Sequence, residues 1–167
     1  MRNRRKPNLR LISETIPDGF ISKPVFVFDV FEATDEFLDE NFRGAITVDS
    51  ELTCDGYVHI SPDGFAFFHK VLLNAIFGES VVHMKMSTDA GIFKVQSSWK
   101  IYNKISHADL ALLRSTAELS GFKMTLSEEG EFGNLTLEVP IKKSPTLAIY
   151  AVSAARMREA FTRVFFF

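Results

Sequence analysis

The sequence contains a single cysteine, Cys54, among its 167 residues. One cysteine excludes an internal disulfide framework and fits a reducing compartment, so we expect a cytoplasmic protein. No segment approaches the roughly 20 consecutive apolar residues of a membrane-spanning helix. The basic start of the chain is not followed by the apolar stretch of a signal peptide. We therefore expect no membrane association.

Strong net charge and the common motifs of catalytic or metal sites are also lacking. The formal net charge is −2, whereas nucleic-acid-binding domains usually have a large basic excess, so no nucleic-acid partner is expected. Phosphate loops of the GxxxxGK[ST] and GxGxxG types are absent. No histidine has a partner at metal-ligand spacing, and Cys54 has no local signature of a catalytic thiol. The sequence predicts no catalytic residue and no metal site.

Hydrophobic residues make up 46% of the chain and include 17 phenylalanines, which is enough for one domain with a full-sized core. We expect a basic, flexible leader over residues 1–23, with a weak contact to an acidic partner as the alternative. Residues 24–140 form the predicted domain. Residues 141–167 form a predicted strand–helix extension that packs on it.

The central element of the predicted fold is a helix over residues 61–78. Ser61 or Asp63 is a candidate N-cap, and Gly78 is suited to the left-handed conformation that ends a helix. Apolar residues recur at helical spacing and predict a core face formed by Phe65, Phe68, Leu72, Ala75 and Ile76. Asn74 interrupts this run. Because an unpaired buried amide is costly, we expect Asn74 to have a hydrogen-bonding partner, which is a neighbouring side chain, a water or a ligand.

The remaining periodicity predicts an alternation of strands and helices. The expected strands cover 25–30, 45–48, 57–60, the hairpins 80–98 and 122–139, and 146–152; the expected helices cover 31–41, 108–120 and 154–164. Hairpins mixed with helices indicate an α+β fold, a two-layer α/β sandwich with a mostly antiparallel mixed sheet. The helices that start near residues 31, 62 and 108 should cover one sheet face, leaving the other face polar.

Three segments resemble one protein family in their order and spacing. Residues 67–76 contain Lys70 and Asn74 four positions apart, on one helix face, and resemble the N box, Asn-x-x-x-Asn-Ala. Residues 110–123 resemble the helix and turn after a second glycine box, and residues 127–140 resemble the closing hairpin. Over about residues 25–140 the chain is thus similar to the ATP-binding domain of sensor histidine kinases, within the GHKL superfamily of gyrase, Hsp90, kinase and MutL ATPases and its Bergerat fold.

The resemblance implies a nucleotide site that this sequence keeps only in part. The counterpart of Asn74 helps to hold a magnesium ion, but Lys70 puts a cation where that ion would bind. Ser98 and Trp99 stand where the first glycine box should supply an aspartate and flexible backbone, and Trp99 is a candidate to fill the adenine space. His107-Ala108-Asp109 replaces the second glycine box.

Two functions follow from these departures. The first is a non-catalytic, nucleotide-binding-deficient, histidine-kinase-like ATPase domain that acts as a protein-interaction or regulatory module in bacterial signalling and needs no cofactor. The alternative is a divergent kinase or ATPase that binds ATP and magnesium through Asn74, with Lys70 contacting phosphate directly.

The C-terminus carries a dense group of aromatic residues, Phe161, Phe165, Phe166 and Phe167. One interpretation is that the last helix docks on the domain and these residues are core. The other is that they form an interface with a protein partner or a second copy of the chain, since exposed apolar patches usually mark binding sites.

Overall fold

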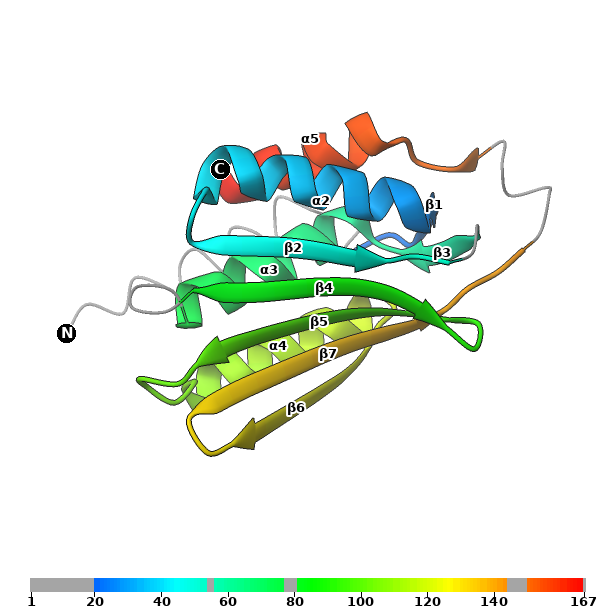
Figure 1. Cartoon of the computed structure of the whole chain (residues 1–167). Coiled ribbons are helices and arrows are strands. Elements are labelled where there is room, and N and C mark those ends of the chain that lie inside the picture. The colour runs from blue at the N-terminus through cyan, green and yellow to red at the C-terminus, as the bar shows by residue number, and fades with distance from the viewer. Residues whose placement is uncertain (1–19, 54–55, 77–80, 144–149, 167) are drawn as a thin grey trace.

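The computed structural model describes residues 20–53, 56–76, 81–143 and 150–166. Its main element is a five-stranded mixed sheet in which four neighbouring strands are antiparallel and β2 pairs in parallel with β4 (Figure 1). The strand order is β2 (Ile46–Glu51), β4 (Val82–Asp89), β5 (Ile92–Lys100), β7 (Phe132–Pro140) and β6 (Lys123–Glu129). A separate antiparallel pair joins β1 (Lys23–Phe26) and β3 (Tyr57–Ile60).

The helices are α2 (Val27–Phe42), α3 (Pro62–Ile76), α4 (His107–Leu119) and α5 (Ala154–Phe166). Figure 1 shows α3 and α4 behind the sheet, and α5 beside α2 at the edge farthest from β6. Alternate residues of the central strands are buried on the helix side, including Met84, Val95 and Leu137. The opposite side carries polar residues, so the expected α+β sandwich with one polar sheet face is confirmed.

Helix α3 has the start and the core face that its sequence predicts. The Ser61 hydroxyl accepts a hydrogen bond from the backbone N–H of Gly64 at 3.0 Å, and Pro62 is the first helical residue. Phe65, Phe68 and Leu72 are fully buried, or nearly so, whereas the other two predicted core residues, Ala75 and Ile76, are half-buried. Gly78, the predicted stop, lies outside the described residues.

The first helix begins earlier than its sequence suggests, so the prediction of a strand over 25–30 is wrong beyond Phe26. The β-branched and aromatic residues after Phe26 favour a strand locally. However, Val27, Val30, Ala33 and Phe37 are all buried, and their spacing places them on one helix face. Burial of this face outweighs the local preference, and α2 starts at Val27.

The C-terminal segment is helical, as expected, and packs against the domain. The predicted strand over 146–152 lies mostly outside the described residues, and within them Val152 forms an isolated parallel bridge with Val25. Helix α5 then lies against α2 and α3. Within the described ranges, every helix is too short or too polar to span a membrane.

Candidate functional site

The residue at the first N-box position, Lys70, contacts the C-terminal helix. Its ammonium Nζ donates a hydrogen bond to the backbone carbonyl of Val164 at 2.9 Å. Val164 lies in the last turn of α5, where carbonyl oxygens have no partner within the helix. Lys70 therefore supplies a cation to the negative end of the α5 dipole. Burial, which disfavours the charged form, lowers the pKa of Lys70.

Asn74, one turn after Lys70, is exposed, so its amide lies at the surface and outside the core face that it interrupts in the sequence. Its side chain forms no hydrogen bond with any other residue that the structure describes.

The residues at the position of the first glycine box point to opposite faces of the sheet. Ser98 lies on the polar face, and its hydroxyl donates a weak hydrogen bond to the carbonyl of His83 at 3.5 Å. Trp99 is only 4% exposed and packs on the helix side, where its indole ring covers Gly133. Successive strand residues alternate between faces, so Ser98 and Trp99 cannot line the same side of a site. Occupation of an adenine space by Trp99 remains a prediction.

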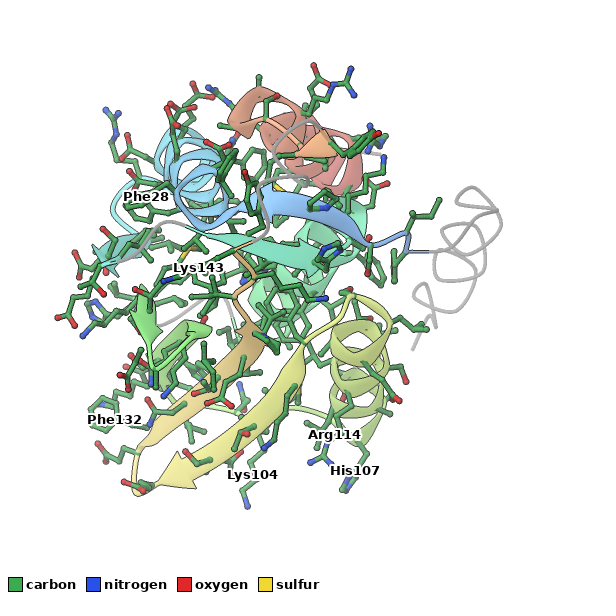
Figure 2. All side chains as sticks on the ribbon, turned by 90° about the vertical axis from the view of Figure 1, so that its right-hand side faces the viewer. Phe28, Lys104, His107, Arg114, Phe132 and Lys143 are labelled. Carbon is green, nitrogen blue, oxygen red and sulfur yellow. The ribbon has the colours of Figure 1, made fainter. Side chains whose placement is uncertain are left out.

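The N-terminus of α4, at the position of the second glycine box, is already capped by the protein. The Ser106 hydroxyl accepts a hydrogen bond from the backbone N–H of Asp109 at 3.1 Å. Asp109 also places a carboxylate in the first turn and is 9% exposed. Helix N-termini bind phosphate through free N–H groups and a positive dipole. Here the Ser106 hydroxyl occupies one of these N–H groups and Asp109 adds a negative charge to the first turn, while His107 points outward into solvent (Figure 2).

The docking of α5 buries two of the four phenylalanines at the C-terminus, one fully and one in part. Phe161 is fully buried; its ring stacks on Phe37 at a centroid distance of 5.1 Å and meets Phe65 edge-on at 5.8 Å. Phe165 is half-buried against Phe37. Phe161 is therefore a core residue and no interface candidate in this structure. Phe166 remains 61% exposed, and Phe167 lies outside the described residues.

Ion pairs surround this aromatic contact, and none of them was anticipated from the sequence. Arg158 of α5 contacts Glu36 at 3.1 Å and also Glu40, both on α2. Arg163 of α5 pairs with Asp63 in the first turn of α3. These pairs join residues more than 90 positions apart, so spacing along the chain gives no signal for them. Together with Lys70, they hold α5 across α2 and α3.

His69, the residue before Lys70, is fully buried and was also missed as a residue of interest. Its Nδ1–H donates to the carbonyl of Phe65 at 2.8 Å, while Nε2 has no partner among the described residues. Burial between Phe65 and Phe68 lowers the pKa of His69 to about 4, because the imidazolium would lose its hydration. The signal available in the sequence was a histidine inside an apolar helical run.

No group of three or more histidine, cysteine, aspartate or glutamate side chains in the described ranges is placed to hold a metal ion.

Comparisons with known proteins identify the fold. The sequence matches no protein family model and no curated protein. Among solved structures, the catalytic domain of histidine kinase ThkA is similar with a TM-score of 0.53 at 12% identity, covering 74% of this chain and 99% of that one. The ATP-binding domain of PrrB from Mycobacterium tuberculosis is similar with a TM-score of 0.53 at 15% identity, covering 73% of this chain and 98% of that one. The chain has the fold of histidine-kinase ATPase domains.

Proposed function

We propose that the chain is a nucleotide-binding-deficient histidine-kinase-like domain that acts as a non-catalytic protein-interaction or regulatory module in bacterial signalling. The observation that carries this proposal is the hydrogen bond from Lys70 to Val164. The helix face that the resemblance assigns to magnesium and phosphate carries a cation, and that cation is engaged by the chain's own C-terminal helix. A metal ion placed beside it would face like-charge repulsion in a partly buried site.

The N-terminus of α4 gives independent support for the lack of nucleotide binding. An incoming phosphate would meet the Asp109 carboxylate and would have to compete with Ser106 for a backbone N–H. Both contacts disfavour an anion at a position where histidine-kinase-like sites need one. The proposal thus rests on two separate elements of the fold.

The alternative, a divergent ATPase that binds ATP and magnesium, is favoured by one observation. Asn74 is exposed and has no described side-chain partner, so a ligand could reach its amide without displacing another contact.

Thermal unfolding in the presence of nucleotide separates the two functions. A ligand present at 100 times its Kd stabilises the folded state by about 2.7 kcal/mol. We expect no change in melting temperature with millimolar ATP or ADP, with or without magnesium. A magnesium-dependent increase that disappears in Asn74→Ala would establish the alternative and reject the proposal.

A further inference from the structure

The strand β6 ends the five-stranded sheet, and its outer edge has no partner in the described part of the chain. Its seven residues, Lys123–Glu129, pair only with β7. Figure 1 shows β6 at the bottom of the molecule, with α4 behind the sheet and the α2–α5 pair at the opposite end. Alternate N–H and C=O groups along such an edge are available to a further strand.

The charges on this edge are arranged so that it is complementary to itself. Lys123 begins the strand and Glu129 ends it, on the same polar face, with Thr125 and Ser127 between them. Two copies of β6 that pair antiparallel about Leu126 place each Lys123 opposite the Glu129 of the other copy. Thr125 then lies opposite Ser127 of that copy. Opposite-charge and hydroxyl pairs are favourable cross-strand neighbours.

A parallel arrangement has the reverse effect, because it places Lys123 against Lys123 and Glu129 against Glu129. Like charges directly opposite one another are destabilising. Charged residues on an edge strand usually discourage pairing altogether. Here the same charges permit one orientation and one register. Neither Lys123 nor Glu129 forms an ion pair with another residue of the described ranges, so both remain available.

The neighbouring strands extend this pattern. In the register of the sheet, Lys123 lies beside Glu138 of β7, and Glu138 is paired with Lys94 of β5 at 3.9 Å. At the other end of β6, Glu129 lies beside Phe132, which is 55% exposed on the sheet face away from α4 (Figure 2). Antiparallel pairing would continue the alternation of charge across the two copies. It would also bring the apolar stem of Lys123 toward Phe132 of the other copy.

We propose that β6 is a homodimer interface in which a second copy of the chain pairs antiparallel and in register about Leu126. The contact is isologous, because the same edge serves both copies, and it joins the two sheets into one. The inference does not depend on the proposed lack of nucleotide binding, since α3 and α5 take no part in it. The proposed interface lies at the β6 edge of the sheet, and the C-terminal phenylalanines are not part of it.

Charge reversal tests the interface directly, with the full chain and sedimentation equilibrium as the measurement. We expect the wild type to dimerise and Glu129→Lys to raise the dimer Kd at least about tenfold, because two attractive pairs become repulsive. Lys123→Glu should act in the same way. The double variant Lys123→Glu, Glu129→Lys should restore dimerisation, since it exchanges the charges and recreates both pairs.

The control is Glu159→Lys, which makes the same charge change on an exposed position of α5 and should leave the Kd unchanged. Circular dichroism checks that each variant is folded. A wild type that stays monomeric at the highest soluble concentration would overturn the proposal. So would a dimer that resists both single reversals but dissociates with Phe166→Ser, or a double variant that fails to regain the dimer.

Discussion

The ammonium group of Lys70 and the carbonyl oxygen of Val164 lie 2.9 Å apart, although 94 positions separate the two residues in the chain. This contact joins the N-box face of α3 to the last turn of α5. Lys70 thus has a structural role, although the resemblance implies a magnesium ion near this position. The fold of a histidine-kinase ATPase domain is thus combined with a C-terminal helix that contacts the face of α3 carrying Lys70.

Replacing Lys70 with Met should destabilise the protein by about 1 kcal/mol, because the half-buried hydrogen bond that the charged Lys70 donates to Val164 is lost while the apolar stem is kept. The free energy of unfolding from urea titration measures the effect. Lys104→Met is the matched control, since Lys104 is exposed and forms no ion pair within the described ranges; its effect should stay within about 0.5 kcal/mol. Equal effects of the two substitutions would show that the contact with Val164 contributes nothing.

Phe161→Ala should destabilise the protein by about 3–5 kcal/mol, because it removes a fully buried ring between Phe37 and Phe65. Phe166→Ala removes the same side chain from a position that is 61% exposed and should cost less than about 1 kcal/mol. Chemical denaturation of both variants tests whether α5 is part of the core. Similar small losses would mean that α5 is only loosely attached in solution.

Acidification should weaken the fold through His69. Its pKa is about 4 in the folded protein and about 6.5 when exposed, so between these values the unfolded chain takes up a proton that the native state does not. Well above pH 6.5 the protonation of His69 does not change the stability, and its destabilising effect grows as the pH falls toward 4.

His69→Leu should remove this part of the pH dependence and keep a similar packed volume. The measurement is the free energy of unfolding at pH 7.5 and pH 5, compared with the wild type and with His107→Leu, whose imidazole is exposed. If the loss on acidification is the same in the wild type and in His69→Leu, the burial of His69 does not control it.

Gly133→Ala should destabilise the sheet by about 1–3 kcal/mol, because an added Cβ would lie 2.6 Å from Cε2 and Cζ2 of the Trp99 indole. The emission of Trp99, the single tryptophan of the chain, should report the displaced ring. Asn134→Ala changes the next residue of β7, on the exposed face, and should alter neither the emission nor the melting temperature appreciably. If Gly133→Ala has the stability and the emission of the wild type, Trp99 does not rest on this backbone.

The sequence predicts the elements whose signals are local. Helix α3 carries a capping serine and a regular apolar period, and both appear in the structure. The position of Asn74 was also predictable from helix geometry. Nine residues at about 100° each place it roughly half a turn from Phe65, hence on the exposed side.

Other features depend on contacts between distant segments and give no local signal. The start of α2 at Val27 follows from burial against the rest of the protein, which outweighs the strand preference of its first residues. The hydrogen bond from Lys70 to Val164 can be predicted only once the docking position of α5 is known. His69 had a local signal in the apolar run around it, but its burial also depends on where α5 docks, because the ring of Phe161 lies 6.4 Å from its imidazole.

Isothermal titration calorimetry of the full chain with ATP and magnesium tests the central claim, the loss of nucleotide binding, most directly. Trp99 fluorescence, recorded in the same titration series, reports any ligand that reaches the core beside it. We predict no saturable heat and no change in emission at millimolar nucleotide. Saturable, magnesium-dependent binding that Asn74→Ala abolishes would contradict the account.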